Sequence, residues 1–328
     1  MFHSRFVNQY YLLLFFISLS PRVMSSEFKS QTPSSAIIPP QPGECENSSK
    51  ATRKKADQKE ASTAHKAKQQ KVIIPNKDGE NLVGLLHETG SKEIVILCHG
   101  FLCTKENNTI KKLALALEND GISAFRFDFA GNGKSQGSLR YGRYWGEVED
   151  LRAVIEYIGG VANRAVNAII GHSKGGDVVL LYASKYHDVH TVVNISGRFE
   201  LMRGVEFHLG KDYMEMIKKE GFVDVKNNKT GSVVYRVTRE SLVECQGTNM
   251  GEVGSGIEKE CKVLTVHGSA DKIVPVEDAL EFAKVIANHK LHIIEGAEHG
   301  YTAQQTELAT VVLDFVRRAT QQDCDTNS

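Results

Sequence analysis

Short apolar segments alternate with amphipathic segments over residues 71–320, and this alternation constrains the fold more than any other feature. The apolar segments have the length of strands, and the segments between them have helical spacing. A hairpin comes first, with Lys71–Pro75 and Leu82–His87 on either side of a turn at residues 76–79. Strands that alternate with helices form a mostly parallel sheet covered on both faces, so the sequence predicts an α/β fold.

Six further strands and five helices are predicted after the hairpin. The strands are Ile94–Cys98, Ala124–Phe129, Ala168–Ile170, Thr191–Ile195, Val263–Val266 and Leu291–Ile294. The helices are Ile110–Leu117, Val148–Ile158, Val178–Tyr182, Val276–Ala287 and Thr306–Arg318. Ligands of such sheets bind at the carboxyl ends of the strands. We therefore expect the functional residues in the loops that follow strands.

One long segment, residues 198–261, interrupts the alternation between two strands. It contains a helical pattern at Lys211–Lys219 and a hairpin pattern formed by Val223–Val225 and Val233–Val237. An insertion of this length beside strand ends predicts a lid subdomain. The alternative is an insertion that has no part in substrate binding.

The ends of the chain differ in composition from the predicted domain. Residues 1–26 contain the apolar run Tyr10–Leu19, two arginines and no acid. This run is too short to span a bilayer and is typical of a signal or transit peptide. The chain would then enter the secretory pathway or an organelle, and a cytoplasmic protein with a disordered leader is the alternative. Residues 27–70 are polar and basic and predict a disordered linker, and residues 321–328 predict a flexible tail.

Charge and cysteine content exclude some classes of protein. Lys+Arg and Asp+Glu both number 40, and this balance argues against a dedicated nucleic-acid binder. There is no C-x-x-C pattern and no Cys/His cluster with zinc spacing, so we expect no structural metal site.

The pattern G-x-S-x-G occurs twice, around Ser173 and around Ser135. In a nucleophile elbow a strand precedes the serine and a helix follows it. Ser173 satisfies this requirement, because an apolar strand leads into Gly171 and a helical pattern follows Gly175. Ser135 does not, because a Gly-rich stretch follows it. We therefore predict that Ser173 is a nucleophile and that Ser135 is a loop residue.

A serine nucleophile needs a base and an acid. In proteins with a nucleophile elbow, both of these residues follow the serine in the sequence. Asp271 and His299 each follow a predicted strand. We predict that His299 takes the proton of Ser173 and that Asp271 orients the imidazole. Glu298 is a competing acid and His267 a competing base, and both rank below this pair.

Backbone N–H groups would stabilise the negative charge that develops in such a reaction. The residue after the nucleophile, Lys174, supplies one of them. The loop that begins His99-Gly100-Phe101 follows a strand, and its glycine permits a close approach of the backbone. We predict that the N–H groups of Phe101 and Lys174 form the oxyanion hole.

Four motifs in order give the chain a resemblance to a known family. They are the His99–Phe101 segment, the Phe127–Ser135 segment, the Gly171–Gly175 elbow, and the Asp271 and His299 segments. Together they resemble the α/β-hydrolase superfamily over residues 71–320, in particular its serine aminopeptidase-like and cinnamoyl (feruloyl) esterase-like branch. The resemblance implies the same triad and oxyanion residues. Lys174 departs from the relatives, many of which carry Gln or Met there, but only its backbone is required.

The expected activity is that of a serine hydrolase that cleaves a small carboxylic ester through an acyl-enzyme, without a cofactor. We expect a monomer with no stable membrane insertion of the mature domain. Phe199, Phe207, Tyr213 and Met214 are the predicted substrate contacts of the lid, or else part of its core. An aminopeptidase, amidase or thioesterase on the same triad is the second possibility. A ligand sensor that uses the hydrolase pocket is the alternative from another class.

Overall fold

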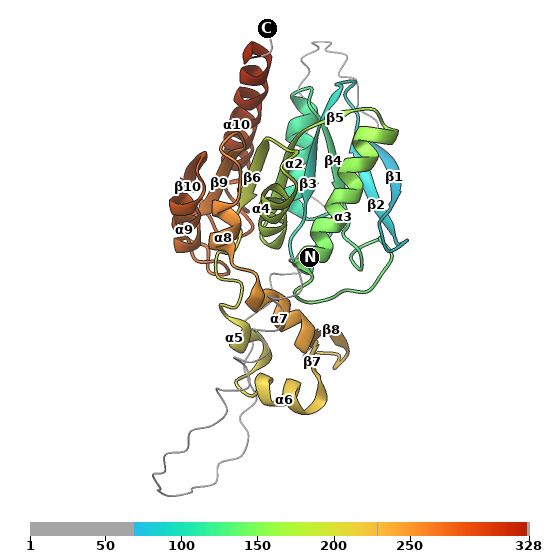
Figure 1. The fold of residues 1–328 in the computed structure, drawn as a ribbon, viewed down its shortest axis with the longest axis vertical. Coiled ribbons are helices and arrows are strands. Elements are labelled where there is room, and N and C mark those ends of the chain that lie inside the picture. The colour runs from blue at the N-terminus through green and yellow to red at the C-terminus, as the bar shows by residue number, and fades with distance from the viewer. Residues whose placement is uncertain (1–68, 228, 327–328) are drawn as a thin grey trace, which may run out of the picture. The chain divides into compact units, whose positions relative to one another are not determined.

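An eight-stranded sheet forms the centre of the protein, as a computed structural model shows for residues 69–227 and 229–326 (Figure 1). The strands are β1 (Gln69–Pro75), β2 (Asn81–His87), β3 (Glu93–Cys98), β4 (Ser123–Phe127), β5 (Ala165–His172), β6 (Thr191–Ile195), β9 (Lys262–Gly268) and β10 (His289–Ile294). Their order is β1-β2-β4-β3-β5-β6-β9-β10. β2 pairs antiparallel with both β1 and β4, and every other pairing is parallel. This confirms the predicted hairpin and the mostly parallel sheet.

Helices cover both faces of the sheet. They are α2 (Asn108–Asn119), α3 (Tyr144–Glu156), a π-helical turn η1 (Tyr157–Val161), α4 (Lys174–Tyr186), α8 (Met250–Ser255), α9 (Glu277–Val285) and α10 (Gln305–Thr326). Side chains of a strand alternate between the two faces. Ile94 and Ile96 of β3 therefore pack in one core with α3, α4, α8 and α9, whereas Val95 and Leu97 pack in a second core with α2 and α10.

The segment between β6 and β9 divides into two parts. Its first part contains α5 (Val205–Leu209), α6 (Tyr213–Glu220), β7 (Phe222–Lys226), β8 (Val233–Thr238) and α7 (Arg239–Gly247). These elements share a core of their own, and we call residues 198–249 the lid. The second part, residues 250–261, places Met250, Ile257 and Cys261 in the main core. Figure 1 shows the lid elements beyond one end of the sheet.

The lid touches the main domain near the carboxyl end of β3. A backbone bridge joins Arg236 of β8 to Arg140 in the loop before α3. The ring of Tyr235 lies edge-on to the ring of Phe101, with 5.1 Å between their centroids. The Glu244 carboxylate of α7 also accepts a hydrogen bond from Trp145 N at 2.9 Å. The lid is thus attached to the loop after β3 and to the start of α3.

Several predicted boundaries shift in the structure. β4 ends at Phe127, because the Asp128 carboxylate and Phe129 N are bound to neighbouring loops. α10 continues through residues 321–326, where we predicted a tail, since no glycine or proline interrupts the helical pattern there.

The predicted leader at residues 1–26 and nearly all of the predicted linker at 27–70 lie outside the described residues. In the described part of the chain, no helix has the length and apolar character needed to cross a membrane.

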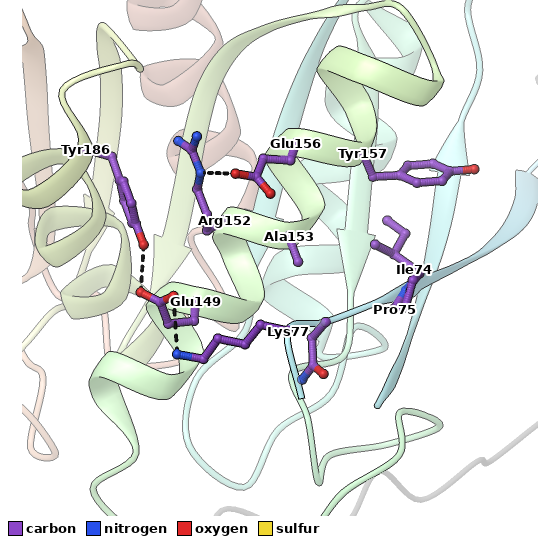
Figure 2. A pocket seen from close by; sticks show the side chains of 10 residues that line it. Ile74, Pro75, Lys77, Glu149, Arg152, Ala153, Glu156, Tyr157 and Tyr186 are labelled. Carbon is purple, nitrogen blue, oxygen red and sulfur yellow. Dashed lines mark hydrogen bonds and ion pairs between the residues drawn. The ribbon is translucent and has the colours of Figure 1, made fainter. Parts of the chain in front are cut away.

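A cavity of about 530 Å³ opens between the β1–β2 turn, the outer face of α3 and the last turn of α4 (Figure 2). Its charged groups are already bound to one another or to near neighbours. Glu149 binds Lys77 and Lys185, and Arg152 binds Glu156. The cavity lies at the opposite end of α4 from the predicted nucleophile, and none of the predicted site residues lines it.

Candidate active site

Ser173 occupies a sharp turn between β5 and α4. Its backbone has φ 57° and ψ −126°, a conformation that non-glycine residues rarely adopt and that is often found at functional sites. Two glycines make the turn sterically feasible. A Cβ at Gly171 would lie 1.9 Å from Gly175 O, and one at Gly175 would lie 2.5 Å from Cys98 O. The strand–turn–helix geometry of the predicted elbow is therefore present around Ser173.

We predict that Gly171→Ala lowers the free energy of unfolding by about 3 kcal/mol, because the added methyl group overlaps the backbone of Gly175. Urea unfolding measures this. Gly159→Ala is the control, since a Cβ at this helical position meets no atom within 4 Å. That change should stabilise the protein by about 0.5–1 kcal/mol. Equal effects of the two substitutions would contradict the steric argument.

His299 and Asp271 meet in the loops after β10 and β9. His299 Nδ1 lies 2.7 Å from Asp271 Oδ2. The other carboxylate oxygen accepts hydrogen bonds from Ile273 N at 2.8 Å and Val274 N at 2.9 Å. Burial would raise the pKa of Asp271, but hydrogen bonds from His267 and His299 outweigh it and hold this pKa well below its usual range. Asp271 is therefore an anion that faces the His299 ring.

The turn that carries Ser173 is also bound to His299. His172 Nε2 donates a hydrogen bond to His299 O at 2.8 Å, and the two rings lie 4.9 Å apart. Ser173 N in turn donates to Ile195 O at 2.8 Å. Among the described residues, no hydrogen bond joins Ser173 Oγ to the His299 ring. Such bonds are often long in the absence of substrate and shorten when substrate binds.

The two competing residues have structural partners. His267 is fully buried, and its Nε2 donates to Val274 O at 3.0 Å while lying 3.5 Å from Asp271 Oδ2. These contacts help to hold the loop that carries Asp271 in place. The Glu298 carboxylate accepts hydrogen bonds from Gly300 N and Thr302 N and so closes the turn around His299.

The loop after β3 approaches Ser173 closely. A Cβ at Gly100 would lie 2.9 Å from Ser173 Cβ, so only glycine allows this spacing. Lys174 is the first residue of α4, where backbone N–H groups have no partner within the helix. Among the described residues, neither Phe101 N nor Lys174 N donates a backbone hydrogen bond. Both N–H groups remain available to an acceptor.

His99 and His172 are buried in neutral form beside the site. Burial lowers the pKa of His99 to about 4, although the hydrogen bond from its Nδ1 to Gly100 O opposes this shift. Its Nε2 accepts a hydrogen bond from Phe129 N, as only the neutral ring can. Burial lowers the pKa of His172 to about 3, and its Nδ1 has no hydrogen-bond partner. Protonation of either ring would place an unpaired charge in the core.

The lowered pKa values of His99 and His172 predict that the protein loses stability in acid. Both rings take up a proton near pH 6.5 in the unfolded chain and only near pH 3–4 in the folded protein. The unfolded state binds more protons between these values, so the free energy of unfolding falls as the pH drops below about 6.5. From pH 7 to pH 5 we expect a loss of roughly 2 kcal/mol per ring. Urea unfolding at both pH values should give a smaller loss for His99→Gln than for the exposed control His190→Gln.

The predicted lid contacts are distributed over different environments. Phe199 packs edge-on against Phe282 of α9, with 5.1 Å between the ring centroids. Tyr213 is buried in the lid core, and Met214 is 55% exposed. The side chain of Phe207 lies outside the described residues. Contact of these four residues with substrate stays a prediction.

Two buried ion pairs near the site were not predicted. Lys105 Nζ lies 2.5 Å from Asp128 Oδ2, and Asp128 also accepts from Lys105 N and Lys134 N. This carboxylate ties the loop after β3 to the loop after β4. Lys174 Nζ lies 2.8 Å from Glu147 Oε1. Asp128 belongs to the motif that carries the family resemblance, whereas no sequence pattern indicates the partner of Lys174.

The chain is similar in sequence to known hydrolases and to one uncharacterised protein. The family model described as serine aminopeptidase, S33, matches residues 89–237. A monoacylglycerol lipase of Mycolicibacterium smegmatis is 21% identical over 230 residues, which are 63% of this chain and 80% of the lipase. An uncharacterised protein of Saccharomyces cerevisiae is 22% identical over 227 residues, or 64% of this chain and 69% of that protein.

Solved structures have the same fold. Est1E from Butyrivibrio proteoclasticus with bound ferulic acid superposes with a TM-score of 0.66 at 22% identity, over 76% of this chain and 100% of that one. The α/β hydrolase GrgF from Penicillium sp. sh18 gives 0.66 at 19% identity, over 77% and 99% of the two chains. The Pyrococcus furiosus esterase Pf2001 gives 0.58 at 20% identity, over 77% and 90%. At these identities the likeness is one of fold.

Proposed function

We propose that this chain, which belongs to the α/β-hydrolase superfamily, hydrolyses a carboxylic ester through Ser173, His299 and Asp271. The observation that supports this most is the 2.7 Å contact of His299 with Asp271, next to a serine on a strained turn. These three residues come from the ends of β5, β9 and β10. The carboxyl ends of the strands are where ligands bind in sheets of this kind.

The reaction begins when Ser173 Oγ attacks the acyl carbon while His299 Nε2 takes its proton. The imidazolium then gives that proton to the departing alcohol, and an acyl-enzyme remains. A water molecule, deprotonated by the same ring, attacks the acyl-enzyme and releases the acid. Asp271 accepts the hydrogen bond of His299 Nδ1 throughout and stabilises the charged ring.

The oxyanion of each tetrahedral intermediate would be bound by Phe101 N and Lys174 N. Their availability and the close approach of Gly100 to Ser173 support this assignment. Donors that are already oriented cost no reorganisation when charge develops. The buried bonds of Asp128 to the Phe101-bearing loop would keep that loop in position.

An ester substrate is favoured over a peptide with a free amino terminus. An aminopeptidase would need a buried acidic group for the substrate ammonium. The lid acids Glu200, Glu206 and Asp212 are all exposed. The likeness to a monoacylglycerol lipase and to esterases points in the same direction. A thioester is chemically similar to an ester and is a substrate to include in the test.

A fluorophosphonate probe tests the proposal, because it reacts with an activated serine. We expect covalent labelling of Ser173, located by peptide mass spectrometry, together with turnover of p-nitrophenyl or hydroxycinnamate esters. Labelling at another serine would contradict the assignment. Labelling without repeated turnover would favour a ligand sensor over an esterase.

A further inference from the structure

A buried ammonium group lies directly next to the proposed nucleophile. Lys174 follows Ser173 in the chain, and its side chain is 5% exposed. Its Nζ lies 2.8 Å from Oε1 of Glu147, which comes from α3 and is 7% exposed. A lysine is rarely buried unless it is paired, and holding this charge here costs desolvation energy. Its position therefore calls for a functional explanation.

Aromatic side chains surround the ammonium group. Nζ lies 4.9 Å from the ring centre of Tyr144 and 5.9 Å from that of Phe101. Phe101 also packs edge-on against Tyr141 and Tyr235, and the rings of Tyr141 and Tyr235 are stacked with each other. Tyr235 belongs to the lid. Lys174 and these rings thus form a cluster shared by the oxyanion loop, the start of α3 and the lid.

The ammonium group retains hydrogen-bonding capacity. It has three N–H donors, and within the described part of the chain Glu147 is its single hydrogen-bond acceptor. Glu147 also balances its charge, so an anionic group would gain little from binding nearby. A neutral oxygen atom would still gain a hydrogen bond from a charged donor, which is stronger than one between neutral groups.

We propose that Lys174 selects acyl groups that carry an uncharged oxygen acceptor, such as an ether, hydroxyl or keto oxygen. The proposal rests on the function proposed above. An acyl group on Ser173 Oγ has its carbonyl oxygen at Phe101 N and Lys174 N, so its chain begins beside the side chains of both residues. Partial exposure of Ser173, Phe101 and Tyr141 leaves an approach to the cluster. Lys174 is then a specificity-determining residue as well as a backbone donor.

Three pairs of p-nitrophenyl esters test this with the full chain. Each pair has equal chain length and differs by one ether oxygen: methoxyacetate with butanoate, 3-methoxypropanoate with pentanoate, and 4-methoxybutanoate with hexanoate. The measured quantity is the ratio of kcat/KM for the ether ester to that for the alkyl ester. Division by the same ratio for hydroxide-catalysed hydrolysis removes the intrinsic reactivity. The wild-type ratio should exceed the hydroxide ratio about tenfold or more for at least one pair.

Lys174→Met should remove this preference, because methionine has similar length and no N–H donor. Since that change leaves Glu147 buried without its partner, the double variant Lys174→Met/Glu147→Gln removes both charges and protects the fold. Lys185→Met is the matched control. Lys185 lies on the same helix and is also bound to a glutamate, Glu149, but it is 41% exposed near the other end of the helix. We expect this control to keep the wild-type ratio.

The outcomes are distinguishable. A wild-type ratio equal to the hydroxide ratio for all three pairs overturns the proposal without any variant. The proposal is also overturned if Lys174→Met and the double variant lose activity on both esters of each pair by the same factor. Lys174 would then act by positioning alone. Failure of the wild-type protein to hydrolyse any of the six esters would instead contradict the proposed function.

Discussion

Ser173→Ala will lower kcat for ester hydrolysis by roughly a factor of 10⁶, which is the size of effect that follows loss of an activated serine nucleophile. The variant keeps a non-glycine residue at the strained position and removes one partly exposed hydroxyl. The fold should therefore be preserved, and thermal unfolding should give a midpoint close to that of the wild-type protein. Initial rates on a p-nitrophenyl ester, compared at equal concentrations of folded protein, measure the loss, and fluorophosphonate should label the wild-type protein but not the variant.

Ser135→Ala is the control, because Ser135 lies in the second G-x-S-x-G match. Its Oγ donates to Asp128 O at 2.6 Å and accepts from Val83 N at 2.8 Å. These bonds hold a loop together, so the substitution should cost about 1–3 kcal/mol of stability and leave Ser173 reactive. An active Ser173→Ala variant beside an inactive Ser135→Ala variant would contradict the elbow assignment.

Asp271→Asn will lower kcat by about 10⁴-fold, because an amide in place of the carboxylate favours the wrong tautomer of the His299 ring. The Asp271 side chain is an anion at neutral pH, since its pKa is held below the usual range despite burial. The asparagine is nearly isosteric and still accepts at one oxygen. A kcat measurement at neutral pH, with urea unfolding as a check on stability, gives the result.

Glu298→Gln is the matched change at the competing acid. Glu298 is exposed and forms hydrogen bonds with Gly300 and Thr302 of its own turn. Glutamine can keep one of these bonds, so kcat should stay within a few-fold of the wild-type value. A larger loss at Glu298 than at Asp271 would assign the orienting role to Glu298.

Much of the fold could be predicted because buried parallel strands have a simple signature. β3, β6 and β9 are buried over almost their whole length and contain short apolar runs, and each ends where a loop with polar residues begins. The order of Ser173, Asp271 and His299 at strand ends then indicated the candidate site. The topology brings Asp271 and His299 into contact because β9 and β10 are neighbours in the sheet.

What could not be predicted depends on packing between elements that are distant in the sequence. Glu147 and Lys174 meet because α3 and α4 pack side by side, and no spacing rule links them. Met250 and Cys261 were expected in the lid but pack in the main core. The sequence does not distinguish these locations, because both cores are built from the same types of apolar residue. His172 reaches His299 O only through the loop after β10, which a single sequence does not place.

The way in which the chain enters and leaves the lid makes the lid exchangeable. It leaves the domain after β6 and rejoins it through α8 and β9, and β6 and β9 are neighbours in the sheet. Most of its buried apolar side chains pack within the lid, although Leu201 and Cys245 pack in the main core. The proposed triad and oxyanion residues lie outside residues 198–249. Recombination within a gene family could therefore replace this module and alter substrate range in one step. In this architecture the residues of the lid can therefore change while the residues proposed to carry out the reaction stay the same.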